Sequence, residues 1–115
     1  MVYVFDLDGT LCTETSGDYT TALPIRERIK KVNDLYYSGH TIKIFTARGM
    51  GRHFDEQKYA REDFEDLTLN QLSEWGIEYH KLILGKESGD LYIDNKGVSD
   101  NEFFTDEDSR ERLGS

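Results

Sequence analysis

Several short apolar segments of this chain each end at a polar residue, and this pattern limits the folds that the chain can adopt. The segments are residues 2–5, 41–45, 81–85 and 91–93, and the polar residues that follow them are Asp6, Thr46, Lys86 and Asp94. Short apolar runs between turn-forming residues are typical of buried β-strands. We therefore expect strands that each deliver a polar side chain at their carboxyl end.

Two stretches between these segments have the apolar spacing of amphipathic helices. The first, residues 24–38, opens with a proline, and Gly39 is placed to end it in a left-handed conformation. The second, about residues 67–75, follows a charged segment at 55–66, and Gly76 is placed to end it. Strands alternating with helices predict an α/β fold: a Rossmann-like, three-layer α/β/α arrangement around a short parallel sheet.

The length of 115 residues predicts a single domain, 1–115, in which about residues 105–115 form a frayed acidic tail. The loop between Leu11 and Pro24 is too short for a separate cap domain. We therefore expect an open site, unless a second subunit of a homo-oligomer covers it.

Composition argues against several classes of partner. The formal net charge of -9 argues against binding to nucleic acid or to an anionic membrane, because both depend on clustered lysine and arginine. The chain has neither the roughly 20-residue apolar stretch of a membrane span nor the pattern of a signal peptide, so we expect a cytoplasmic protein. Its single cysteine, Cys12, rules out an intrachain disulfide and is interpreted as a small buried residue.

The expected strand ends would place several reactive groups at one edge of the sheet, where parallel α/β sheets bind ligands. Asp6 and Asp8 follow the first strand, and Gly9 allows the chain to turn sharply away. Phosphoryl transfer to a carboxylate needs an ionised nucleophile, a divalent metal ion and donors to the phosphate oxygens. In this reading one aspartate attacks phosphorus and the other acts as acid and base.

The segment Asp6-Leu7-Asp8-Gly9-Thr10, directly after the strand, resembles the first motif of the haloacid dehalogenase superfamily. The resemblance implies that Asp6 is the nucleophile that forms an aspartyl phosphate. It implies that Asp8 protonates the leaving group and then activates water, while its backbone carbonyl binds Mg²⁺. Because the dehalogenase branch lacks the second aspartate, the resemblance favours phosphate ester hydrolysis.

The remaining motifs of that superfamily have candidates at the other strand ends. The resemblance implies phosphate binding by the hydroxyl of Thr46, with Ala47 and Arg48 beside it, although a solvated surface position for Arg48 is equally compatible with the sequence. It implies that Lys86 neutralises charge on both the phosphate and Asp6. Lys81 is the weaker candidate for that role, because it precedes its strand.

The fourth motif is an acidic metal site, and the resemblance implies that Asp94 is a Mg²⁺ ligand together with Asp6 and Asp8. Many relatives have two successive acids here, whereas Asn95 follows Asp94 in this chain. Asp90 is discounted as a ligand because it lies at the start of the strand. The three histidines have no spacing typical of a metal cluster.

Longer stretches up to Phe104 resemble a group of phosphatases of capsule or polysaccharide biosynthesis. This resemblance implies a small phosphorylated substrate such as a sugar phosphate. Two alternatives stay open: a catalytically weakened binding protein, supported by Asn95, and a phosphatase acting on nucleic-acid ends, opposed by the net charge of -9.

Overall fold

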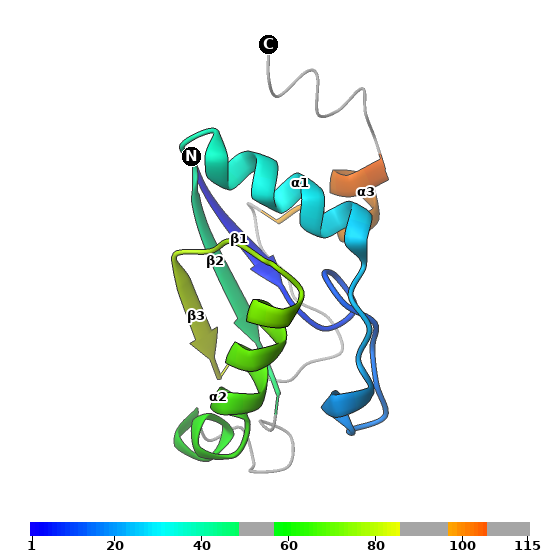
Figure 1. Ribbon diagram of the computed structural model, residues 1–115, viewed down its shortest axis with the longest axis vertical. Coiled ribbons are helices and arrows are strands. Elements are labelled where there is room, and N and C mark those ends of the chain that lie inside the picture. The colour runs from blue at the N-terminus through cyan, green and yellow to red at the C-terminus, as the bar shows by residue number, and fades with distance from the viewer. Residues whose placement is uncertain (49–56, 86–96, 106–115) are drawn as a thin grey trace.

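The computed structural model of the protein describes residues 1–48, 57–85 and 97–105. In chain order the elements are β1 (Val2–Asp6), the 3-10 helix η1 (Tyr19–Thr21), α1 (Arg26–Tyr37), β2 (Thr41–Thr46), α2 (Gln57–Glu74), β3 (Lys81–Leu84) and α3 (Asp100–Thr105) (Figure 1). The predicted α/β class is confirmed. Between β1 and α1 the chain forms only a loop and η1, so the described residues contain no separate cap domain.

The sheet is parallel, as predicted, with strand order β1-β2-β3. Phe5 is paired with Ile44, and Thr46 with Leu84, so the carboxyl ends of all three strands lie at one edge. Just beyond β3, the N–H of Gly85 donates to the carbonyl of Thr46 at 3.1 Å. The predicted ends of these strands at Asp6 and Thr46 are therefore confirmed.

Helices α1 and α2 cover the same face of the sheet (Figure 1). Two successive right-handed crossovers that advance in one direction, from β1 to β2 to β3, place both helices on one side. Hydrogen bonds join the two helices where α2 ends: Arg26 donates to the carbonyl of Trp75 at 3.0 Å, and Asn33 to that of Gly76 at 2.8 Å.

The core lies between this face and the helices. Phe5, Ile42 and Ile44 of the strands are buried against Val32 of α1 and Leu72 of α2. On the opposite face Val2 and Val4 are 57% and 52% exposed. Within the described ranges, the helices form one layer on one face of the sheet. None of the described helices forms the second helical layer of the predicted three-layer arrangement.

The predicted helix ends at Gly39 and Gly76 are confirmed. Gly39 has φ +96°, and its N–H donates to Tyr36 while the N–H of His40 donates to Leu35, so the last carbonyls of α1 are satisfied. Gly76, with φ +69°, closes α2 in the same way. Both sites need a residue that adopts positive φ without strain, which favours glycine.

The predicted helix starts were wrong. Helix α1 begins at Arg26 and not at Pro24, because Pro24 is held in an isolated bridge with Cys12. Helix α2 begins at Gln57, so it includes most of the charged segment that was expected to precede it. Glutamate, lysine and arginine are good helix formers and sustain a helix without an apolar repeat.

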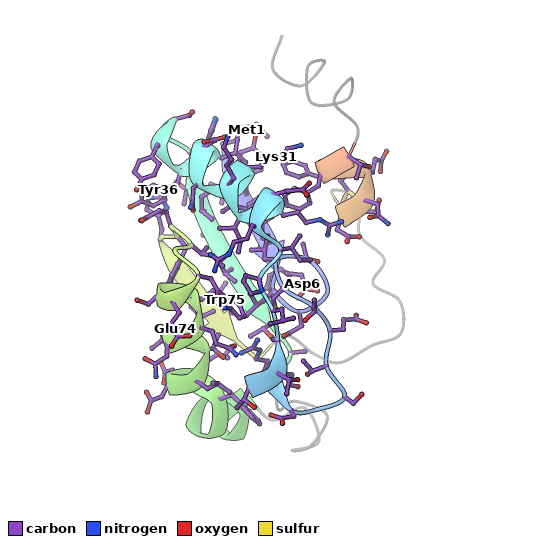
Figure 2. All side chains as sticks on the ribbon, turned by 45° about the vertical axis from the view of Figure 1, so that its right-hand side comes forward. Met1, Asp6, Lys31, Tyr36, Glu74 and Trp75 are labelled. Carbon is purple, nitrogen blue, oxygen red and sulfur yellow. The ribbon has the colours of Figure 1, made fainter. Side chains whose placement is uncertain are left out.

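Helix α3 packs against α1 through polar contacts and against β1 through aromatic contacts. Arg28 pairs with Asp100 at 2.7 Å, and this hydrogen bond lowers the pKa of the Asp100 carboxyl. Lys31 of α1 extends toward α3 and donates to the carbonyl of Phe104 at 2.7 Å (Figure 2). The rings of Phe5 and Phe104 lie 5.9 Å apart.

Two predicted features lie outside the described residues: the strand at 91–93 and most of the acidic tail, 106–115. The single-domain organisation stays a prediction. None of the helices that the structure describes is long and apolar enough to cross a membrane.

Replacing Phe104 by alanine should lower the free energy of unfolding by about 3 kcal/mol, because a buried aromatic side chain is lost and leaves a cavity. Phe104 is 7% exposed. Denaturant unfolding measures the change. Val98→Ala is the matched control, since Val98 is 56% exposed in the same C-terminal segment and should change stability by less than about 0.5 kcal/mol. Equal effects of the two substitutions would contradict the packing of α3.

Candidate active site

The site begins where β1 ends and the chain turns sharply. Asp6 is the last residue of β1 (Figure 2), and its Oδ1 accepts a hydrogen bond from the N–H of Leu7 at 3.0 Å. The carbonyl of Leu7 then accepts the N–H of Leu11 at 2.9 Å, which closes the turn. Gly9 adopts φ +83° inside this turn, a conformation that side-chain-bearing residues rarely adopt. The turn brings Asp8 back toward β2.

Thr46 joins the end of β2 to this turn. Its hydroxyl donates to Oδ2 of Asp8 at 2.8 Å, although the two residues are 38 positions apart in the sequence. Thr46 is completely buried, and its oxygen also accepts the N–H of Arg48 at 3.2 Å. The fold therefore brings the predicted acid and base residue into contact with the predicted phosphate-binding threonine.

Arg48 forms the main ionic contact of the site. Its Nη2 lies 2.9 Å from Oδ1 of Asp8, and its Nε lies 3.1 Å from both carboxylate oxygens. The arginine is 1% exposed, so the alternative of a solvated surface arginine was wrong. A buried arginine needs a paired anion, which Asp8 provides. Ala47 lies between Thr46 and Arg48, directly after β2.

The other side of the guanidinium is held by α2 and η1. Nη1 of Arg48 donates to the hydroxyl of Thr68 at 3.2 Å and to Oε1 of Gln71 at 2.5 Å. Gln71 donates in turn to the carbonyl of Tyr19 at 2.7 Å. The ring of Tyr19 covers the guanidinium, with its centroid 4.8 Å from Cζ.

Sequence reasoning did not assign Thr68 and Gln71 to the site. Both are buried polar residues of α2, at 0% and 6% exposure, and they lie close in sequence to the buried Leu72. Polar side chains at core-facing helix positions need hydrogen-bond partners. This signal would have marked the two residues as part of a buried polar network, although it would not have identified Arg48 as their partner.

Cys12 packs against the same carboxylate as a neutral thiol. Its Sγ lies 3.6 Å from Oδ1 of Asp8, and the residue is completely buried, as predicted. Burial is the main cause that raises the pKa of Cys12 to about 12, and the negative charge of Asp8 adds to it while Arg48 opposes it. The thiol therefore stays protonated at neutral pH and contributes no second negative charge beside Asp8.

Lys86 and Asp94, which the motifs predict to belong to the site, and Asn95 after them lie outside the described residues. The hydrogen bond from Gly85 to Thr46 fixes the chain next to the site immediately before Lys86. In the part of the chain that the structure describes, no three histidine, cysteine or acidic side chains form a group able to hold a metal ion. The carboxylate of Asp6 and the carbonyl of Asp8 are nevertheless hard oxygen donors, which fit Mg²⁺.

Comparison by sequence identifies no relative: no family model and no curated protein matches this chain. Comparison by structure identifies solved proteins with a similar fold. A structural-genomics target from Vibrio cholerae superposes with a TM-score of 0.86 at 25% identity, over 97% of this chain and 94% of that one.

Two further solved structures have named activities or assemblies. The D,D-heptose 1,7-bisphosphate phosphatase from B. bronchiseptica, complexed with magnesium and phosphate, superposes with a TM-score of 0.52 at 12% identity, over 80% of this chain and 53% of that one. A chain of the Pnkp1/Rnl/Hen1 complex gives 0.54 at 20% identity, over 92% of this chain and 33% of its own length. These similarities show that the chain shares its α/β fold with these proteins.

Proposed function

We propose that the protein is a Mg²⁺-dependent phosphatase that hydrolyses a small phosphate monoester through an aspartyl phosphate on Asp6. The observation that supports this most directly is the contact between Asp8 and Thr46 at 2.8 Å. It joins two motifs distant in sequence at the edge of the sheet where Asp6 also ends its strand. Such an edge is the usual ligand site of a parallel α/β sheet.

The proposed reaction has two steps. In the first, Asp8 has taken up a proton on substrate binding, a carboxylate oxygen of Asp6 attacks phosphorus, and the bond from phosphorus to the leaving oxygen breaks as Asp8 gives that proton to the leaving oxygen. In the second, a water oxygen attacks phosphorus and Asp8 takes the water's proton. The bond from phosphorus to Asp6 then breaks, which releases inorganic phosphate and restores the carboxylate.

The surrounding residues serve these steps in distinct ways. The hydroxyl of Thr46 can donate only one hydrogen bond, and in this structure it donates that bond to Asp8. An oxygen of a bound phosphate would compete with Asp8 for this hydrogen bond. Lys86 is proposed to neutralise charge on the phosphate. Bound Mg²⁺, held by Asp6, the carbonyl of Asp8 and Asp94, would offset the repulsion between the nucleophile and the phosphate.

A sugar phosphate is the proposed substrate class. The resemblance of the sequence to phosphatases of polysaccharide biosynthesis supports it, as does the fold shared with a heptose bisphosphate phosphatase. The net charge of -9 favours a small substrate over a polyanion.

Asp6→Asn should abolish phosphate release, lowering kcat by several orders of magnitude, because an amide cannot form the aspartyl phosphate. Phosphate release from 4-nitrophenyl phosphate with Mg²⁺ measures the effect. Asp34→Asn is the matched control: it makes the same chemical change on α1, at a side chain that is 66% exposed. Retained activity in Asp6→Asn would exclude Asp6 as nucleophile.

Removing divalent metal ions with a chelator should also stop turnover, and adding Mg²⁺ should restore it. The physical reason is that a carboxylate and a phosphate dianion repel each other unless a cation lies between them. Full activity in the chelator would contradict the proposed cofactor.

A phosphatase acting on nucleic-acid ends is the second candidate, favoured by the structural similarity to a chain of the Pnkp1/Rnl/Hen1 RNA repair complex. A direct competition separates the two candidates. We expect kcat/KM to be higher for sugar phosphates than for oligonucleotides carrying a terminal phosphate, since the chain is strongly acidic. The reverse order, or tight binding of single-stranded DNA at low salt, would favour the second candidate. Binding of phosphate and Mg²⁺ without turnover of any substrate would favour a weakened binding protein.

A further inference from the structure

We propose that Gln71 is a positioning residue: it holds Arg48, and Arg48 in turn fixes the carboxylate of Asp8. A residue of α2 would thus determine the orientation of Asp8, the proposed acid and base group. This inference rests on the proposed phosphatase function, because it concerns how Asp8 is aimed at the leaving oxygen.

The hydrogen bonds of Arg48 favour a role in holding Asp8 over a direct contact with phosphate. A guanidinium has five N–H donors and no acceptor. In this site Nε donates to Asp8, Nη2 donates to Asp8 and to Sγ of Cys12, and Nη1 donates to Thr68 and Gln71. Every donor is engaged inside the protein, so none is left for a substrate oxygen without breaking one of these contacts.

Gln71 is held in one orientation by two different partners. Its carbonyl oxygen faces a donor, Nη1 of Arg48, while its amide nitrogen lies 2.7 Å from an acceptor, the carbonyl of Tyr19. Exchanging the two ends of the amide would place donor against donor and acceptor against acceptor. The side chain is 6% exposed, so water cannot readily replace either partner.

The guanidinium is therefore confined on two sides. The Tyr19 ring covers it at 4.8 Å, and Tyr19 is itself fastened to α2 through Gln71. Both carboxylate oxygens of Asp8 accept hydrogen bonds, one from Arg48 and the other from Thr46. Loss of Gln71 would remove one contact of Arg48 and the contact that holds the carbonyl of Tyr19, so the carboxylate of Asp8 would be held less firmly in one direction.

The chemistry of the leaving group separates this role from a structural one. A phenolate with a low pKa leaves with little help, whereas a more basic oxygen depends on the proton from Asp8. A misdirected Asp8 should therefore slow the hydrolysis of substrates with poor leaving groups selectively. A loss of folded protein would lower the rate for every substrate equally.

The experiment compares Gln71→Leu with the unmodified full chain on 4-nitrophenyl phosphate and on phenyl phosphate, with Mg²⁺. We expect kcat/KM to fall about tenfold or more for phenyl phosphate and only about twofold for 4-nitrophenyl phosphate, mostly through kcat. The ratio of the two losses does not depend on how much of the variant is folded. Asn70→Leu is the matched control, because it removes an exposed amide from the neighbouring position of α2 and should leave the ratio unchanged.

A second variant tests whether Gln71 acts through Arg48. Arg48→Lys keeps the charge but loses the planar two-pronged contact with Asp8, so it should show the same selective loss. Adding Gln71→Leu to Arg48→Lys should then cost less than about twofold more on phenyl phosphate, because residues in one network are not additive. Equal losses on both substrates, or fully additive effects, would overturn the proposal and leave the phosphatase function intact. An unmodified chain inactive on every phosphate ester would overturn the phosphatase function, and with it this proposal.

Discussion

The buried ion pair between Arg48 and Asp8 is the contact on which the arrangement of the site depends. The arginine side chain is fully buried and the aspartate side chain is 21% exposed, so the arginine charge depends on its protein partner and not on water. Removing one partner of such a pair costs about 3–5 kcal/mol, because the other charge stays buried without compensation. The pair therefore requires the end of β2 to meet the turn after β1. Thr46, Thr68 and Gln71 complete its hydrogen bonds.

The sheet supplies the frame that makes this contact possible. Parallel pairing sets Asp6 and Thr46 at one edge, and two crossovers in the same direction place α1 and α2 on one face. Because α2 lies over the end of β2, its polar residues can reach Arg48 from the side opposite Asp8. In the proposed phosphatase, α2 would therefore orient the acid and base group, Asp8, through Arg48.

Sequence reasoning succeeded where the signal was local. The apolar runs of β1 and β2 stop at Asp6 and Thr46, and Gly39 and Gly76 end their helices through backbone conformations that glycine adopts without strain. It failed where structure depends on contacts between distant residues. The burial of Arg48 requires Gln71, 23 positions away, and α3 is held by Arg28, 72 positions away. No spacing rule relates such residues before the chain has folded.

The complete set of hydrogen bonds around Arg48 has an evolutionary consequence. An orphaned buried donor costs about 1–3 kcal/mol, whereas a coordinated exchange of both partners can be nearly neutral. Thr68 and Gln71 should therefore drift little on their own while Arg48 is present, and they should be replaced together in lineages that lose it. Covariation among these positions would then indicate which relatives keep the buried arginine, whatever substrate each relative uses.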